Sequence, residues 1–223
     1  MTTYYVDFNN QASQTWTMAV YQELPNSIGL QSVSWKQSTA PVGGSTGVSW
    51  EESYNVAIAD YKQEGGRGVY KASQTLKAAL GTAWEIAFED NVQQLRPVGT
   101  TTPGQILINN KSKRLANPGI GMSGQGSVYK RDVVDGASAQ FLVTPTYWVG
   151  LFNNVILGEV ISSNVIVGPL QIKFPSGMNR ATLDATMDGS SILLSLTYSS
   201  ALMTQSFVVQ ERLKLEKLTL KAG

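Results

Sequence analysis

The stretch Trp84-Glu-Ile-Ala-Phe-Glu-Asp-Asn-Val92 carries the clearest structural signal in the sequence. Its tryptophan, isoleucine and phenylalanine alternate with other residues, which is the period of a strand with one buried face. The Asp90-Asn91 pair that follows favours a tight hairpin turn. Residues 182–195 repeat this arrangement around Asp188-Gly189. The sequence therefore predicts two β-hairpins of the same kind.

Short strands are predicted along the rest of the chain. Trp16–Val20 alternates in the same way, and glycine clusters interrupt the strands as turns or loops at residues 43–44, 65–68 and 119–126. Ala72–Leu80 has helix-favouring residues, but its counterpart Val165–Phe174 is β-branched and contains Pro169, so we expect strands at both. Strands spaced by about 8–12 residues are typical of an all-β sandwich or barrel.

The order of several motifs indicates a tandem duplication. Val6-Asp-Phe-Asn-Asn10 matches Ile106-Leu-Ile-Asn-Asn110, and Tyr54–Ile58 matches Tyr147–Leu151. We therefore expect an all-β protein of two tandem homologous antiparallel β-sandwich-like halves. The halves are residues 1–98 and 104–198, joined by a linker at 99–103. The residues alone leave open whether the halves share one core or form two.

The C-terminal tail, residues 199–223, has no counterpart in this duplication. Between Glu211 and Lys221, charged residues are interspersed with four leucines, Leu213, Leu215, Leu218 and Leu220. Their spacing fits neither a flat strand nor a simple helix. We expect the tail to dock through these leucines on one of the halves or on a neighbouring chain.

The composition excludes several classes of function. The 223-residue chain has no cysteine and no histidine, which excludes disulfides, thiolate or imidazole metal sites and a Ser-His-Asp triad. Its 17 basic and 16 acidic residues give a net charge of +1, so nucleic acid is not an expected partner. We find no signal-peptide pattern and no apolar stretch of bilayer length, and we expect synthesis in the cytoplasm. Release by lysis or by a signal-free route stays open.

Two acidic groups could carry chemistry. Glu51-Glu52 with Asp60 could supply paired carboxylates, but the alternation around them places at least one in solvent. Asp132 and Asp135 could offer oxygens to a hard cation, but the ligand spacing of a calcium loop is absent. We therefore predict no catalytic residue and no metal site.

Two glycine-rich stretches and one basic stretch resemble phosphate sites only superficially. Gly65–Gly68 and Gly119–Gly126 do not lead into a helix and lack the lysine of a nucleotide-binding loop. Lys111–Arg114 fits a solvated hairpin loop in a chain that is neutral as a whole. We predict no cofactor.

The aromatic residues give the only indication of a binding surface. Trp16, Trp50 and Trp84 are in phase with other apolar residues, so we assign them to the core. Trp148 is out of phase with Tyr147 and Val149, and it either contacts a partner or lies between the two halves. It is the leading candidate for binding. Two weaker candidates are Trp35 and Tyr129.

Several stretches of the chain resemble the RhiA family, bacterial proteins first associated with expression in the rhizosphere. These stretches are Phe8-Asn9-Asn10, Trp16-Thr17-Met18, Val20-Tyr21-Gln22, Ser32–Lys36, Val48-Ser49-Trp50, Tyr70–Leu76 and Gln105–Asn110. The resemblance implies a density-regulated soluble protein that acts between microbe and host, and it brings no catalytic residues. The first two strands are also similar to those of aegerolysins, which are small lipid-binding β-sandwich proteins.

We therefore expect a non-enzymatic interaction or structural protein that acts through surface contacts and associates with itself. The alternative is a lipid- or glycan-binding module of a host-directed, insecticidal or membrane-active system, whose partner is a host membrane lipid or a glycan. A carboxylate-based hydrolase is the third interpretation. An unpaired tail strand favours the first, because it can add to the sheet edge of another protomer.

Overall fold

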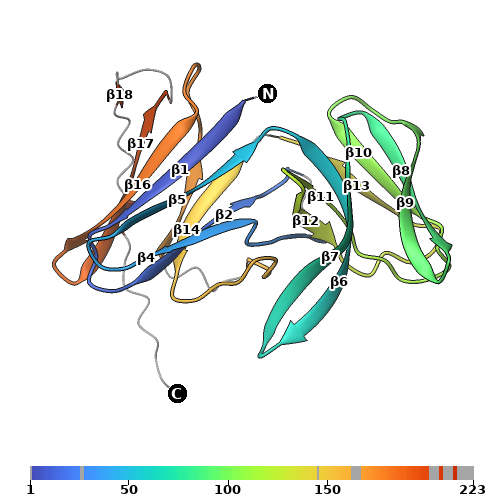
Figure 1. Ribbon diagram of the computed structural model, residues 1–223, viewed down its shortest axis with the longest axis horizontal. Helices are drawn as coiled ribbons and strands as arrows, with labels where there is room; N and C mark the ends of the chain where they lie inside the picture. Colours follow the sequence, from blue (N-terminus) through green and yellow to red (C-terminus); the bar gives the residue numbers. More distant parts are fainter. Residues whose placement is uncertain are drawn as a thin grey trace.

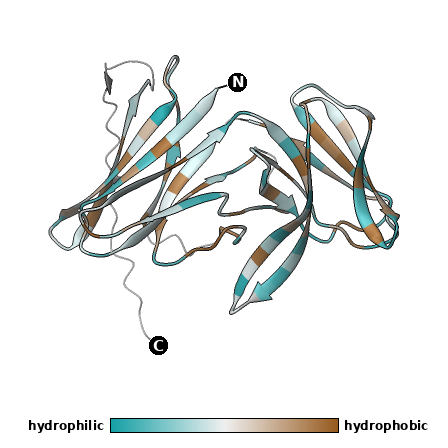
Figure 2. Cartoon of the chain, in the orientation of Figure 1, coloured by the Kyte–Doolittle hydropathy of each residue, from teal (hydrophilic) through white to brown (hydrophobic). Residues whose placement is uncertain are grey.

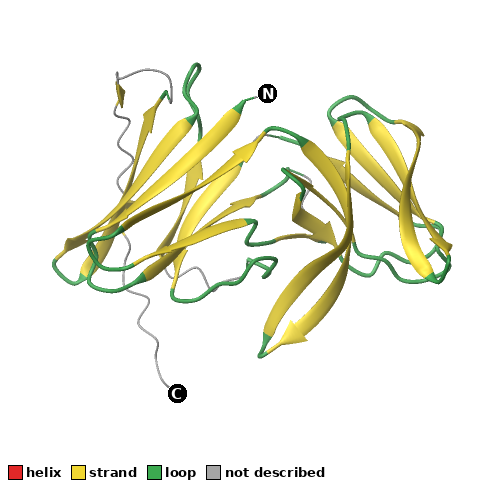
Figure 3. Cartoon of the chain, in the orientation of Figure 1, coloured by secondary structure: helices red, strands yellow, loops and turns green. Residues whose placement is uncertain are grey.

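The computed structural model describes residues 2–25, 28–144, 146–161 and 167–200, and the backbone of 206–207 and 213–214. Every regular element in this part of the chain is a strand (Figure 3), which confirms the all-β prediction. The same residues contain no helix that could cross a membrane. The strands form four sheets, and these pack as two β-sandwiches that lie side by side (Figure 1).

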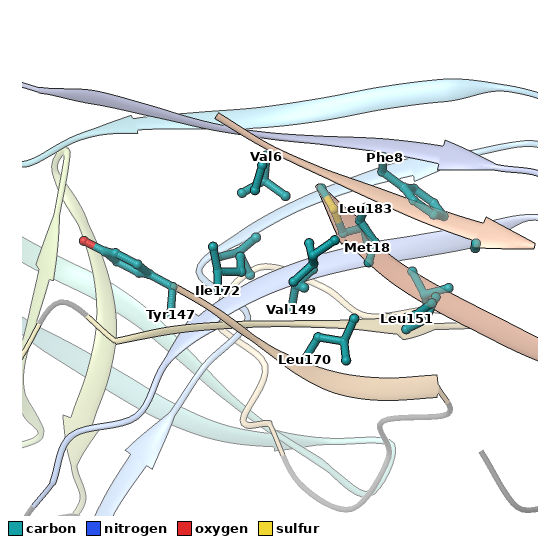
Figure 4. Packing of buried hydrophobic residues seen from close by; sticks show 14 of the residues in the cluster. Val6, Phe8, Met18, Tyr147, Val149, Leu151, Leu170, Ile172 and Leu183 are labelled. Carbon is teal, nitrogen blue, oxygen red and sulfur yellow. The ribbon is translucent and has the colours of Figure 1, made fainter. Parts of the chain in front are cut away.

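The first sandwich contains both ends of the described chain. One of its sheets has the order β5 (Ser45–Glu51), β1 (Thr3–Asn10), β16 (Arg180–Asp188) and β17 (Ser191–Ser199). The facing sheet has the order β4 (Lys36–Ala40), β2 (Trp16–Gln22), β14 (Tyr147–Phe152) and β15 (Val167–Ile172). Apolar side chains from both sheets, such as Phe8 and Val149, meet in one buried cluster (Figure 4), and this burial is the main stabilising contribution.

The second sandwich is built from the middle of the chain. One sheet has the order β13 (Ser138–Leu142), β10 (Gln105–Asn110), β8 (Thr82–Glu89) and β9 (Val92–Thr100). The other has the order β3 (Leu30–Ser32), β12 (Gln125–Lys130), β11 (Pro118–Met122), β6 (Tyr54–Glu64) and β7 (Arg67–Lys77). Ile86, Ile108 and Ile120 belong to its core. Tyr54 packs against both cores and connects the two sandwiches.

Strand periodicity accounts for most of these elements. Along β10 every second residue is buried, and Trp84 and Ile86 of β8 are buried as the sequence predicts, although Glu85 and Ala87 are buried too. Brown bands mark the hydrophobic residues of these strands in Figure 2. The strand β2 differs, because all seven of its residues are buried. Its second face is covered where Ala19 packs with Phe152 and Val155. A strand with one solvated face was therefore the wrong expectation for β2.

Every sheet combines strands from residues 1–100 with strands from residues 105–199. The strand β1 runs parallel to β16 and antiparallel to β5, and β10 likewise runs parallel to β8 and antiparallel to β13. Residues 54–142 form most of the second sandwich, so this unit is inserted between the two parts of the first. The linker predicted at residues 99–103 overlaps a strand, because β9 continues through Thr100.

Two buried asparagines, one in each sandwich, share a pattern of hydrogen bonds. The Asn10 side chain donates to the carbonyl oxygen of Gln14 (2.9 Å) and accepts from the amide of Ala12 (3.1 Å). The Asn110 side chain donates to the carbonyl oxygen of Arg114 (2.7 Å) and accepts from the amide of Ser112 (3.0 Å). Each fixes the loop that leaves its strand. The duplication itself stays a prediction. The structure adds that the Asn10 and Asn110 side chains bind the loops after their strands in the same way.

The turn predictions hold with two corrections. Asp90 and Asn91 have positive φ values of 50° and 64° and close the β8–β9 hairpin as predicted. The β16–β17 hairpin turns at Gly189-Ser190, one residue later than predicted, because Asp188 still pairs with Ser191, and only Gly189 of this turn has a positive φ (61°). Residues 119–126 were predicted as a loop, but Gly119 and Gly121 lie in β11 and Gly126 lies in β12. Glycine is required at 119 and 126 because a Cβ at either position would overlap the Tyr129 side chain.

The described part of the tail pairs with the edge of its own chain. Ser206–Phe207 (β18) and Leu213–Lys214 (β19) both run antiparallel to β17. The backbone of Leu213 is therefore placed beside Leu194. The predicted contact residues Leu215, Leu218 and Leu220 lie outside the described residues.

Candidate functional site

An open groove of about 1050 Å³ lies on the second sandwich. Three segments border it, namely the β6–β7 hairpin, the β8–β9 hairpin and the loop 111–117 (their strands are at the right of Figure 1). Its lining is Asp60, Ser73, Gln74, Phe88, Asn91, Val92, Gln93, Gln94, Arg114 and Leu115. This volume is at the upper limit of those of small-molecule and cofactor sites.

The β8–β9 hairpin supplies the aromatic and apolar part of the groove. Phe88 is half-buried, and the Arg114 guanidinium lies over its ring at 4.0 Å from the centroid. Val92 is 52% exposed, and Leu115 from the neighbouring loop is 60% exposed. Two large aliphatic side chains are thus exposed to solvent within one groove.

Hydrogen bonds hold two of the groove's amides in place. Gln74 accepts at Oε1 from the backbone amide of Leu95 (2.6 Å). Gln93 donates from Nε2 to the hydroxyl of Ser112 (2.8 Å) and to the carbonyl oxygen of Leu115 (3.0 Å). Both side chains are therefore positioned before any ligand arrives.

The loop 111–117 owes its shape to Asn110 and to an ion pair. Besides the bonds described above, Asn110 donates to the carbonyl oxygen of Val133 (2.8 Å). The Lys111 ammonium lies 2.9 Å from the Glu85 carboxylate, which also binds Arg96 at 2.6 Å. Hydrogen bonds from Lys111 and then Arg96 hold the pKa of Glu85 below its ordinary value. Lys111, Lys113 and Arg114 are all exposed, as the prediction of a solvated loop requires, and Lys111 and Arg114 each also contact the second sandwich.

Two opposite charges line the groove without pairing to each other. Asp60 and Arg114 both border it, and no ion pair joins them among the described residues. In the first sandwich, the residue four after the buried asparagine is Gln14, which donates to Asn153 Oδ1 at 3.0 Å and ties the loop to the end of β14. Arg114 is also four residues after its asparagine. The groove therefore lies where the first sandwich has the hydrogen bond between Gln14 and Asn153.

Two of the three predicted binding residues are buried. Trp35 is 1% exposed and packs edge-on against Trp50 with the ring centroids 5.2 Å apart. Tyr129 is 2% exposed and stacks on Tyr70 at 4.5 Å, and its burial raises its pKa to about 12. Neither side chain presents a surface to a ligand, so both expectations are corrected. Trp50 itself is core, as predicted.

Trp148, the leading candidate, lies on the outer face of its sheet. It pairs across the strands with Tyr21 of β2 and Gln171 of β15. Its side chain is half-buried, and its indole nitrogen is buried without a hydrogen-bond partner among the described residues. A binding role for Trp148 stays a prediction, and the residue is not part of the groove.

The acidic candidates do not come together. Tyr54, two residues after Glu52, lies on the same strand as Asp60 and about 20 Å from it, because a strand rises about 3.3 Å per residue. Glu52 instead accepts a hydrogen bond from the Tyr54 hydroxyl (3.2 Å). Asp135 accepts from the backbone amide of Lys113 (2.9 Å), as expected of a turn. Within the described residues, no three carboxylates are placed to hold a metal ion.

Sequence reasoning missed the groove, although it noted some of its residues in other contexts. Asp60 appeared as a carboxylate and Arg114 as part of a basic loop, whereas Gln93 and Leu115 gave no signal. A comparison of the residues four positions after Asn10 and Asn110 would have shown Gln14 against Arg114. The difference between Gln14 and Arg114 is the one sequence feature that indicates the groove on the second sandwich.

The comparison with protein families decides the relationship. A model of the RhiA family matches residues 1–194. The chain belongs to the RhiA family. It is 28% identical over 185 residues to the protein RhiA of Rhizobium leguminosarum bv. viciae, covering 79% of this chain and 80% of that protein. No solved structure matches. The RhiA match includes every groove residue and ends before the tail.

Proposed function

We propose that this RhiA-family protein is a non-enzymatic interaction protein, and that the groove of the second sandwich is its contact site. It acts on a surface between the bacterium and its host. The observation that carries the proposal is the groove's combination of exposed aliphatic side chains with polar side chains fixed in position. Val92 and Leu115 are each more than half exposed beside the fixed amides of Gln74 and Gln93.

The scaffold around the groove supports this proposal. Loops that carry binding residues work best when a rigid framework holds them. Here Asn110 fixes the loop that presents Arg114 and Leu115, and the two-residue turn fixes Val92. The unpaired Asp60 and Arg114 provide one charge of each sign for a partner.

A sedimentation assay with matched variants tests the proposal. The full chain is incubated with liposomes of anionic and sterol lipids, with bacterial cells and with plant root tissue, and the bound fraction is measured. We expect binding to at least one of these targets. Leu115→Asp should reduce it at least about tenfold, because a charge in an apolar contact costs more than 1.4 kcal/mol. Val42→Asp is the control, since Val42 is 58% exposed on the first sandwich.

Equal binding of the two variants would contradict the groove as the contact site, as would a failure to bind any target. Binding to liposomes alone would identify the partner as lipid and favour the membrane-directed alternative.

We propose as a second function that copies of the chain associate through the tail. The supporting observation is that β18 and β19 add to the edge strand β17, a kind of pairing that a second chain can replace. Truncation after Ser200 should then convert an oligomer into a folded monomer, as measured by light scattering. A truncated protein that keeps the parent's mass would refute exchange. A monomeric full chain whose truncated form associates would show that the tail only covers the edge.

A further inference from the structure

The lining of the groove indicates which class of ligand it takes. We infer that the groove binds a neutral oligosaccharide chain; this inference rests on the proposed function of the groove as a contact site. Four of its ten lining residues are carboxamides, and only Asp60 and Arg114 are charged. Their charges cancel, so the lining does not favour a polyanion such as nucleic acid or an anionic lipid surface.

Carboxamides and hydroxyls are complementary in hydrogen bonding. Each carboxamide offers both donors and acceptors, and so does each sugar hydroxyl. Gln93 donates both hydrogens of its amide within the protein, which leaves its carbonyl oxygen as an acceptor. Gln74 uses its carbonyl oxygen internally, which leaves its NH₂ group as a donor. The two fixed amides thus present opposite hydrogen-bonding groups to one ligand.

The unpaired side chains extend this pattern. Within the described residues, Asp60 and Gln94 have no side-chain hydrogen bond or ion pair, although both border the groove. A carboxylate can accept from two neighbouring hydroxyls, and such charge-assisted bonds are the strong ones. The exposed aliphatic surfaces of Val92 and Leu115 suit the C–H faces of sugar rings.

A peptide that adds as a strand fits this groove less well. On β9 the residues whose backbone faces away from β8 include Gln93, Leu95 and residue 97, because Glu89 and Val92 close the hairpin. The Leu95 amide already donates to Gln74, and residue 97 is a proline with no amide hydrogen. The edge therefore offers a peptide few donors, while the side chains of the groove remain available.

Isothermal titration of the full chain tests the inference. The probes are hexasaccharides of β-linked glucose, mannose and xylose, with acidic oligogalacturonate for comparison. We expect at least one neutral probe to bind, with an affinity that changes less than about twofold between about 50 and 500 mM salt. Asp60→Asn and Gln94→Ala should each weaken binding about tenfold, whereas Gln14→Ala in the first sandwich should leave it unchanged.

Each other outcome overturns the inference. Binding of oligogalacturonate alone, with an affinity that falls as salt rises, would show an anionic ligand. If no sugar binds but Leu115→Asp still abolishes sedimentation, the glycan inference fails and the proposed function stands. If Leu115→Asp changes neither sedimentation nor sugar binding, both the glycan inference and the proposed function of the groove fail.

Discussion

At the scale of single residues, the buried amide of Asn110 determines the shape of one border of the groove. Its side chain bonds to Arg114, Val133 and Ser112 and is fully buried. Asn110→Ala leaves these buried and partly buried partners unsatisfied, so it should lower the free energy of unfolding by about 2–4 kcal/mol. Urea unfolding measures the change. Asn109→Ala is the control, because Asn109 makes one long bond to Trp84 (3.4 Å). Equal losses for the two variants would contradict this role.

The ion pairs of Glu85 predict a dependence of stability on pH. Its pKa in the folded protein lies below the ordinary value of 4.5. A lowered pKa contributes stability above the unfolded-state value, and this contribution is lost as the pH falls through the folded-state pKa. Glu85→Gln should therefore lower the free energy of unfolding at pH 7 by about 1–2 kcal/mol, since half-exposed cations are screened by solvent. Below that pKa the difference should vanish.

Urea unfolding of the wild type and of Glu85→Gln, from pH 7 down to below the folded-state pKa of Glu85, measures the difference in the free energy of unfolding. Glu89→Gln is the matched control, because the Glu89 side chain is 52% exposed and, within the described residues, its carboxylate forms one ion pair, with Arg96. A gap between wild type and Glu85→Gln that is constant with pH would show that shape, and not charge, is responsible.

The sequence could predict that aromatic residues in phase with a strand are buried, but it could not predict whether the other aromatic residues are accessible to a ligand. Trp16, Trp50 and Trp84 follow the strand period and are buried. Trp35 and Tyr129 gave no such periodic signal, because Trp35 lies outside any strand and Tyr129 faces the outer side of its sheet. Tyr70, from a distant strand, covers Tyr129, and only the folded chain brings the two together.

At the scale of elements, the β11–β12 hairpin depends on a glycine at a bulge. The pairing register shifts between Ile120 and Gly121, and a Cβ on Gly121 would overlap the carbonyl oxygen of Gln125. Gly121→Ala should therefore destabilise the protein by about 2–3 kcal/mol, measured as a shift of the thermal midpoint.

Gly124→Ala provides the comparison in the same hairpin. Gly124 has a φ of +74° and nothing within 4 Å of its Cβ position, so alanine there adds only backbone strain of about 1 kcal/mol. A larger loss for Gly124→Ala than for Gly121→Ala would contradict the overlap.

Elements with a local signal were predictable and those defined by packing were not. The β8–β9 and β16–β17 hairpins follow from alternation and turn residues. The strand β7 was expected only from its counterpart Val165–Phe174, because its own residues favour a helix. The glycines of β11 and β12 suggested a loop, because nothing local shows that an aromatic ring from the same hairpin needs the space.

At the scale of the whole molecule, the two sandwiches are assembled from strands far apart in sequence. The parallel pair β1–β16 joins Tyr5 to Arg180, whereas β8–β10 joins Trp84 to Ile108. Periodicity gives each strand a buried face but does not name its partner. The groove depends on that assembly, since its lining comes from β6, β7, β8, β9 and the loop after β10. It therefore could not be located from the sequence.

The central claim is that the groove of the second sandwich is where this protein contacts its partner. Hydrogen–deuterium exchange of the full chain, free and bound to the target that retains it in sedimentation, tests this most directly. We predict slower amide exchange in residues 91–95 and 111–117, with residues 42–44 and 189–190 of the first sandwich unchanged. Slower exchange confined to the first sandwich, or around Trp148, would contradict the claim.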